Sequence, residues 1–322
     1  MPVISAHANG YLDHPTLRLL SEISIDVPIV QINQFSNYEF NEDLYKLKDW
    51  VLADFMEMGA NSYDCKETLL FGHNAIKFDK ANTWDWIKFD EFVQANPPKL
   101  YFKRELLKND RTSNVHPINF PCFWQASPPV SKVEFESRPI DVFNSWGYSH
   151  ELRRHFHGEV FINAVHRNRA VIDNYSHLEE ELKDARKKWV SIFTPHHSRL
   201  PMDYVLTVQG MSKLSVSLPG AGLSCFRHAE APLNSVMVMR ADPLKYSYDW
   251  VHNENCIMFP VGEDMDSIRG ITGAKEAIET IEEALQNPNL YDIYLEGVAN
   301  CEKYKLNNYV KNYIEPLIKL YL

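Results

Sequence analysis

The sequence predicts an α/β protein of two domains, each with a parallel sheet between helices, that face each other across a cleft. The chain of 322 residues fits two cores of roughly 150 residues each better than one core. Short β-rich runs alternate with helical stretches, which is typical of parallel sheets with crossover helices. This alternation fails over residues 110–139, a segment with five prolines. We therefore place the domain boundary near Ser137, between residues 1–137 and 138–322.

The N-terminal half begins with a strand, a helix and a second strand. Leu17, Leu20 and Ile23 recur at helical spacing and predict a helix over residues 14–24. The other elements expected in this half are strands over residues 2–7, 26–33 and 67–72 and helices over residues 41–60 and 84–96.

A second alternating set follows the proline-rich segment. The strands expected in it cover residues 140–146, 170–175, 213–219, 235–240 and 254–260. The helices expected in it cover residues 149–165, 178–193, 201–212, 223–234 and 273–287, and a long one begins at about Leu290. Two similar α/β halves imply that ligands bind where the carboxyl ends of parallel strands meet.

Composition excludes several classes of protein. A net charge of -10 argues against a nonspecific nucleic-acid binder, which needs clustered Lys and Arg. The five cysteines form no CxxC pair, so neither a zinc site nor a disulfide framework is indicated, and a reducing, cytoplasmic setting is expected. No stretch reaches the roughly 18 apolar residues of a membrane span, and no secretory signal is seen.

The segment after the strand at 213–219 carries the strongest chemical signal. Small residues follow that strand and would let backbone amides approach a phosphate; these are Pro219, Gly220, Ala221 and Gly222. Arg227 and Glu230 follow three positions apart and project from one helical face. The alternatives are a tight turn followed by a solvated ion pair, or a site where the cation meets a diphosphate and the anion holds ribose hydroxyls. Spacing alone does not decide between them.

The stretches at residues 212–239 and 246–260, SKLSVSLPGAGLSCFRHAEAPLNSVMVM and YSYDWVHNENCIMFP, resemble the nucleotide-binding half of GT-B glycosyltransferases. The resemblance is to exostosin-like and related bacterial and viral sugar transferases and covers roughly residues 139–260. It implies two Rossmann-like α/β/α domains, with the C-terminal helix crossing back to the N-terminal domain. The N-terminal domain would bind the acceptor, and the C-terminal domain would bind the nucleotide sugar, which is a substrate and not a cofactor.

The resemblance also implies roles for individual residues. Arg227 would neutralise the diphosphate with help from Lys213, and Glu230 would hold the ribose. The stretch NSWGYSHELRR resembles the first strand, loop and helix of this half and would place four residues beside the sugar or phosphates: Gly147, Tyr148, Ser149 and Arg153. The alternative for this stretch is an ordinary helix start with Ser149 as N-cap. The second glutamate of retaining relatives, eight residues from the first, is absent because positions 222 and 238 hold Gly222 and Val238.

The expected reaction is metal-independent and inverting. An arginine and backbone amides suffice to stabilise a leaving diphosphate, and no DxD triplet lies at a convincing strand end, so no metal ligand is assigned. Inversion needs a base that deprotonates the acceptor hydroxyl. Candidates follow strands of the N-terminal half and stay unresolved as a pool of Asp13, His14, His73 and Asp79.

Aromatic side chains are expected to recognise a glycan acceptor. Trp84, Trp86 and Trp124 lie in segments that would reach the cleft, although burial in a core is the alternative. The relatives indicate a UDP-sugar as the sugar donor, UDP-xylose or UDP-glucose by default. Two other functions stay open: a noncatalytic carbohydrate-binding protein, and a nucleotide-sugar epimerase, although the N-terminal half lacks a G-x-G-x-x-G fingerprint.

Overall fold

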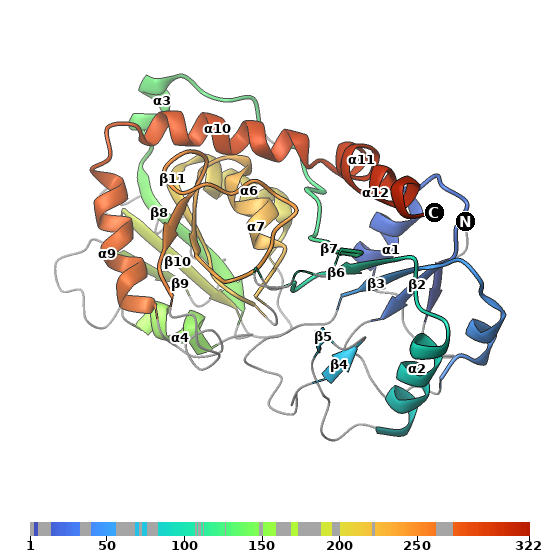
Figure 1. Ribbon diagram of the computed structural model, residues 1–322. Helices are drawn as coiled ribbons and strands as arrows, with labels where there is room; N and C mark the ends of the chain where they lie inside the picture. Colours follow the sequence, from blue (N-terminus) through green and yellow to red (C-terminus); the bar gives the residue numbers. More distant parts are fainter. Residues whose placement is uncertain are drawn as a thin grey trace.

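The chain folds into two α/β bodies, shown side by side in the computed structural model of Figure 1. The structure describes residues 3–5, 14–32, 40–55, 68–70, 73–75, 83–106, 108, 111, 113–125, 127–147, 151–158, 169–172, 188–194, 200–220, 223–261 and 273–322. Each body is a parallel sheet covered on both faces, as the sequence predicts.

The first sheet has the strand order β1-β2-β3-β6-β7, and all of its pairs are parallel. Its strands are β1 (Val3–Ser5), β2 (Ile29–Ile32), β3 (Val51–Asp54), β6 (Leu100–Lys103) and β7 (Val115–Pro117). The hairpin β4 (Thr68–Leu70) and β5 (His73–Ala75), the helices α1 (His14–Ser21) and α2 (Thr83–Ala95), and the 3-10 helix η1 (Glu42–Lys46) complete this part of the chain. Neighbouring residues of β2 point to opposite faces of the sheet, so Ile29 lies in the core with α1 and Val30 lies in the core with α2.

The helix expected over residues 41–60 is wrong. Among residues 41–55, the described part of this stretch, η1 alone is helical, and Val51, Leu52 and Ala53 lie in β3, fully buried. This strand pairs with β2 on one side and β6 on the other, so its apolar run is buried on both faces of the sheet. A continuous apolar run suits a central parallel strand and a buried helix equally, and pairing decided the outcome.

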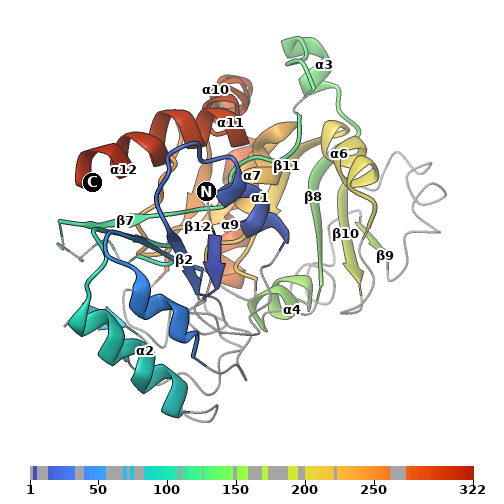
Figure 2. The ribbon, with the colours of Figure 1, turned by 90° about the vertical axis from the view of Figure 1, so that its right-hand side faces the viewer.

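The second sheet has the order β13-β12-β11-β8-β10-β9, again all parallel. Its strands are β8 (Ile140–Gly147), β9 (Arg169–Ile172), β10 (Trp189–Thr194), β11 (Ser212–Ser217), β12 (Val236–Arg240) and β13 (Ile257–Phe259). The helices are α3 (Lys132–Glu136), α4 (Glu151–Gly158), α6 (Met202–Gly210), α7 (Arg227–Glu230), α9 (Ala274–Leu285) and α10 (Leu290–Lys303), with the 3-10 helix η4 (Ala231–Leu233). Figure 2 shows α4 beside the ends of β8 and β10.

Two further expectations in this half need correction. The end of the helix expected over residues 178–193 is β10, which lies between β8 and β9 and carries the buried Val190 and Ile192. The helix expected over residues 223–234 is shorter, because α7 ends at Glu230 and continues as η4 around Pro232. Proline has no N–H for the next turn of an α-helix.

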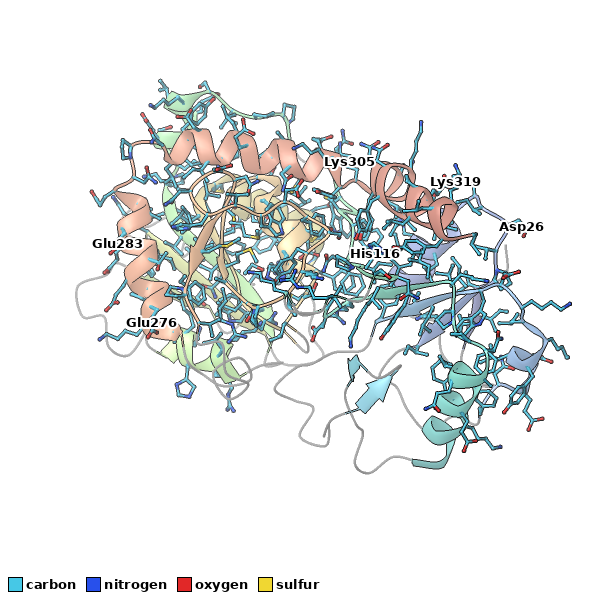
Figure 3. All side chains as sticks on the ribbon, in the orientation of Figure 1. Asp26, His116, Glu276, Glu283, Lys305 and Lys319 are labelled. Atoms are coloured by element: carbon cyan, nitrogen blue, oxygen red, sulfur yellow. The ribbon has the colours of Figure 1, made fainter. Side chains whose placement is uncertain are left out.

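The C-terminal helices cross from the second body to the first, as the resemblance implies. Tyr294 of α10 stacks on Phe135 of α3 at a centroid distance of 4.9 Å, within the core of the second sheet. After Lys305, which Figure 3 labels at the crossing, the chain continues as α11 (Leu306–Tyr309), a π-helical turn (Val310–Ile314) and α12 (Glu315–Tyr321). Ile314 and Ile318 from this segment are buried in the core of the first sheet. Through Phe135, α3 packs with the second body although it precedes Ser137.

Candidate functional site

The loop after β11 lies at the carboxyl end of the second sheet and is anchored by an arginine from α4. Leu218, Pro219 and Gly220 are all buried. Nη2 of Arg153 donates a hydrogen bond of 3.0 Å to the carbonyl oxygen of Leu218. A Cβ placed on Gly220 would lie 2.9 Å from the same Nη2 atom. Glycine at this position is therefore what lets the loop and the guanidinium approach so closely.

Arg153 is buried, with 8% of its surface exposed. Burial lowers the pKa of its guanidinium to about 10, and Cys225 opposes that shift. The charges of Arg227 and Glu230 also act on this group. The arginine that follows β8 and the arginine of α7 thus share one electrostatic environment around the loop.

Arg227 and Glu230 form an ion pair on α7. Nη1 of Arg227 lies 3.3 Å from Oε2 of Glu230, and 20% and 17% of the two side chains are exposed. The pair is neither fully solvated nor sealed in the core. Both side chains are partly accessible to solvent. Because a partly exposed ion pair is only of modest strength, a ligand could replace the contact between them.

A cysteine and a histidine of the same segment form a second pair that the sequence analysis did not single out. Nδ1 of His228 lies 3.2 Å from the backbone nitrogen of Cys225 and 3.6 Å from its Sγ. His228 is buried, and Cys225 is partly exposed. Burial alone would raise the pKa of the thiol, but His228 and Arg153 outweigh it and lower that pKa to about 6. The spacing of three residues was the available signal.

The N-terminal domain holds this segment through Ser224. Nε of Arg104, which follows β6, donates to the carbonyl oxygen of Ser224 at 3.0 Å. The backbone N–H of Ser224 donates to Oε1 of Glu105 at 3.1 Å, and Nδ2 of Asn119 donates to its Oγ at 2.9 Å. The carboxyl ends of β6 and β11 therefore meet at Ser224, which places the loop and α7 where the two sheets face each other.

Asn119 extends this contact to two further segments. Its Oδ1 accepts hydrogen bonds from the backbone nitrogen of Ser247 at 2.6 Å and from Oγ of Ser247 at 2.7 Å. Its backbone N–H donates to Oη of Tyr309 at 3.1 Å. Through its side chain and its backbone N–H, this one buried residue, which follows β7, is bonded to the segment before α7, the segment after β12 and the crossing helix.

Lys213 lies at the other end of the sheet from this loop. Its Nζ pairs with Oδ1 of Asp141 at 2.9 Å, near the amino ends of β11 and β8. Ser217 lies four positions further along the strand, or roughly 13 Å at 3.3 Å per residue. The expected contribution of Lys213 to the diphosphate site is therefore not supported by its position.

The other residues of the expected sugar-donor site are only partly covered. Gly147 is the last residue of β8 and pairs with Thr194 of β10, at the carboxyl edge. Tyr148, Ser149, Ala221 and Gly222 lie outside the described residues.

Of the residues expected to act as base or to bind the acceptor, Trp124 is the one whose side chain the structure describes. His14 begins α1, His73 begins β5, and Trp84 and Trp86 lie in α2, with backbone positions alone described. Asp13 and Asp79 lie outside the described residues. Trp124 is 40% exposed and follows Cys122, whose Sγ donates to the carbonyl oxygen of Trp124.

Within the described part of the chain, no cluster of three or more His, Cys, Asp or Glu residues could hold a metal ion. Within the same residues, no helix is long and apolar enough to cross a membrane.

Comparison with known proteins finds matches among solved structures, and none by sequence. No family model matches the chain, and no curated protein matches its sequence. The E. coli trehalose-6-phosphate synthase, in a structure bound with UDP-2-fluoro glucose, is 11% identical in sequence, with a TM-score of 0.47 over 94% of this chain and 75% of that one. TarM is 11% identical, with a TM-score of 0.46 over 97% of this chain and 59% of that one. The pneumococcal O-GlcNAc transferase GtfA in complex with UDP and GlcNAc is 8% identical, with a TM-score of 0.48 over 96% of this chain and 61% of that one.

This chain thus spans about three-fifths of the length of TarM and GtfA. Because all three TM-scores lie below 0.5, these likenesses assign neither an activity nor a site to the chain.

Proposed function

We propose that the protein is a glycosyltransferase that moves a sugar from a nucleoside diphosphate to a hydroxyl of a glycan acceptor. The observation that carries the proposal is that Arg153 is hydrogen-bonded to the buried glycine loop after β11, while the charge of Arg227, which pairs with Glu230 on α7, acts on Arg153. Two guanidiniums match the two phosphates of a leaving diphosphate, and a carboxylate accepts hydrogen bonds from ribose hydroxyls. The position at the carboxyl edge between two sheets supports the same assignment.

The proposed chemistry is a single inverting displacement. The acceptor oxygen attacks the anomeric carbon while a base takes its proton, and the bond between that carbon and the diphosphate oxygen breaks. Arg153 and Arg227 stabilise the negative charge that develops on the leaving diphosphate. The base belongs to the pool of Asp13, His14, His73 and Asp79. Inversion is proposed because the exostosin-like relatives invert, and the glycine and valine at positions 222 and 238, where retaining relatives have a second glutamate, argue against retention.

We propose UDP as the nucleotide and xylose or glucose as the sugar, on the basis of the sequence resemblance. Trp84, Trp86 and Trp124 are the proposed acceptor contacts. The proposed reaction is independent of metal ions because the arginines already supply the positive charge. Activity retained in EDTA supports this, and strict dependence on added Mn²⁺ contradicts it.

The experiment that tests the function is calorimetric titration with UDP, GDP, CMP and dTDP, followed by donor hydrolysis and transfer assays with the matching sugar nucleotides. One of the four nucleotides should bind clearly. Arg227→Ala should remove about 2.7–4 kcal/mol of transition-state stabilisation, which lowers kcat by roughly 10²–10³-fold. Binding of sugars but of none of the four nucleotides would indicate a noncatalytic carbohydrate-binding protein. Conversion of the sugar nucleotide into an epimer without any acceptor would indicate an epimerase.

A further inference from the structure

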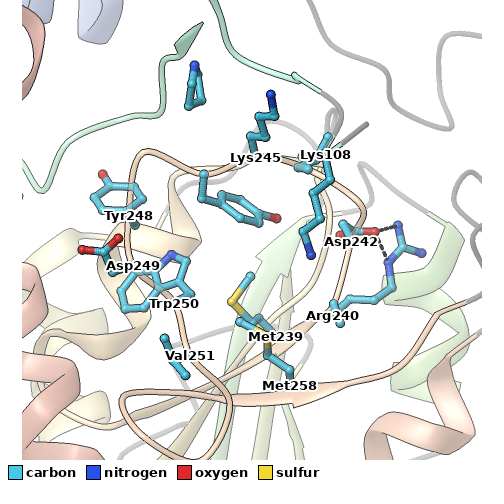
Figure 4. A pocket seen from close by; sticks show the side chains of 14 residues that line it. Lys108, Met239, Arg240, Asp242, Lys245, Tyr248, Asp249, Trp250, Val251 and Met258 are labelled. Atoms are coloured by element: carbon cyan, nitrogen blue, oxygen red, sulfur yellow. Dashed lines mark hydrogen bonds and ion pairs between the residues drawn. The ribbon is translucent and has the colours of Figure 1, made fainter. Parts of the chain in front are cut away.

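A separate pocket lies beside the ends of β12 and β13, and its volume is about 470 Å³. This falls in the range of roughly 300–1,000 Å³ that holds small molecules. Figure 4 shows Met239 and Met258 on one side of the pocket and Trp250 on another. Lys108 reaches the pocket from the N-terminal domain. None of its lining residues belongs to the loop after β11 or to α7.

Among the described residues, three buried polar atoms of residues that line the pocket have no hydrogen-bond partner. Asp242 is 1% exposed, and its Oδ1 accepts from Nε of Arg240 at 2.7 Å and pairs with Nη2 at 2.6 Å. Its Oδ2 is buried and has no partner among the described residues, and neither do Oη of Tyr246 and Nε1 of Trp250. Buried polar atoms are nearly always hydrogen-bonded, so three such atoms in one pocket indicate a polar ligand.

A cation completes the set. Lys108 makes no ion pair within 4.0 Å with any described residue, although its charge reaches Asp242 and lowers the pKa that burial raises there. In Figure 4, Lys108 extends into the pocket toward Asp242, whereas Lys245 extends away from it. The backbone nitrogen of Lys108 donates to the carbonyl oxygen of Pro243 at 2.9 Å, which fixes the lysine against the loop after β12.

We propose that this pocket binds a single sugar ring that carries an anionic group, a sugar phosphate or a uronic acid. The Trp250 ring offers a face for the apolar side of a pyranose, and Lys108 meets the anionic group. Because Arg240 already balances the charge of Asp242, its second oxygen accepts from a neutral hydroxyl, and a ligand ammonium would leave excess positive charge. Oη of Tyr246 and Nε1 of Trp250 donate to the remaining hydroxyl oxygens of the sugar.

The pocket shares no lining residue with the proposed sugar-nucleotide site, although Tyr246 packs against His228 of α7, so its test measures binding and not turnover. The full-length chain is titrated calorimetrically with glucose 6-phosphate, glucuronic acid and glucose. Both acidic sugars should bind, and glucose should bind about tenfold more weakly because it lacks the group that meets Lys108. Tighter binding of glucose 6-phosphate would indicate that the anionic group is a phosphate, and tighter binding of glucuronic acid would indicate a carboxylate.

Two variants and one matched control sharpen the test. Lys108→Ala should reduce the affinity for the preferred acidic sugar to that of glucose, while Lys245→Ala, whose side chain extends away, should leave it unchanged. Tyr246→Phe removes a hydroxyl without a described partner, so the fold is retained and all three sugars should bind several-fold more weakly. Binding of neither acidic sugar, an unchanged affinity in Lys108→Ala, or displacement of the sugar by UDP would overturn the proposal.

Discussion

Sγ of Cys225 lies 3.6 Å from Nδ1 of His228 at the start of α7. His228 and Arg153 lower the pKa of the thiol to about 6 against the effect of burial, and Cys225 raises the pKa of His228. An ordinary cysteine has a pKa of about 8.5 and is mostly protonated at neutral pH. The lowered pKa favours the thiolate form of Cys225 at neutral pH, next to the proposed diphosphate site.

Alkylation of Cys225 should follow this pKa. Since the thiolate fraction grows as pH rises through the pKa, the iodoacetamide rate should be half-maximal near pH 6 and level above pH 7. Cys122 and Cys256 should stay unreactive, because burial raises their pKa values to about 11 and about 12. Peptide mass mapping measures each site. In His228→Gln the midpoint should move toward the ordinary value; a midpoint above pH 8 in the wild type would contradict the thiolate assignment.

Gly220→Ala and Gly210→Ala form a matched pair. A Cβ at Gly220 meets Nη2 of Arg153 at 2.9 Å, so alanine must displace a buried, hydrogen-bonded guanidinium. We expect a loss of about 1–3 kcal/mol in the free energy of unfolding, together with weaker nucleotide binding. Gly210 ends α6 and has open space around it, so alanine there should be neutral or stabilise by about 0.4–1 kcal/mol. Urea unfolding compares the two, and equal stabilities would remove the packing argument for Gly220.

Asn119→Ala should destabilise the junction of the two domains. The substitution leaves Oγ of Ser224 and the backbone nitrogen of Ser247 without their partner, at a cost of about 1–3 kcal/mol for each buried group left unpaired. Asn308→Ala serves as control, because Asn308 is exposed and its side chain makes one hydrogen bond among the described residues, to the carbonyl oxygen of Glu302. Denaturant unfolding measures both variants. If they lose the same small amount, the buried contacts of Asn119 do not hold the domains together.

Glu230→Gln distinguishes a ribose contact from a structural ion pair. A carboxylate that accepts from ribose hydroxyls should lose about 1.5–3 kcal/mol of nucleotide binding when its charge is removed. A 2′-deoxy nucleotide should bind the wild type poorly and lose much less in the variant, since the hydroxyl partner is already missing. If Glu230 only pairs with Arg227, the change should stay under about 1 kcal/mol. Titration calorimetry with both nucleotides decides between these outcomes, with thermal unfolding as the check on the fold.

Local pattern predicted most of the second sheet and less of the first. Val236–Arg240 is apolar except for its last residue, and such a run is typical of a buried parallel strand. Trp189–Thr194 is also a strand, but it follows a charged stretch with helical spacing and was assigned to that helix. Periodicity cannot distinguish these cases when the apolar run is short, and pairing partners far along the chain decide the outcome.

The candidate site shows the same division. The spacing of Arg227 and Glu230 places them on one helical face, and the structure finds them as an ion pair. The contact between Arg153 and Leu218 joins positions 65 residues apart, and no local pattern contains it. The resemblance implies a role for Lys213 at the site, yet its strand carries it to the opposite edge of the sheet.

The sequence by itself determined two alternating α/β halves, the glycine loop after β11 and the two charges that follow it, because each depends on residues within a few turns or one strand. The tertiary structure alone decided that Arg104, Glu105 and Asn119 hold Ser224, and that Lys108 from one domain reaches Asp242 from the other. These contacts exist only when two separately wound sheets pack with their carboxyl ends together. Their geometry is set by the burial of both cores and the crossing of the C-terminal helices, which no short stretch of sequence encodes.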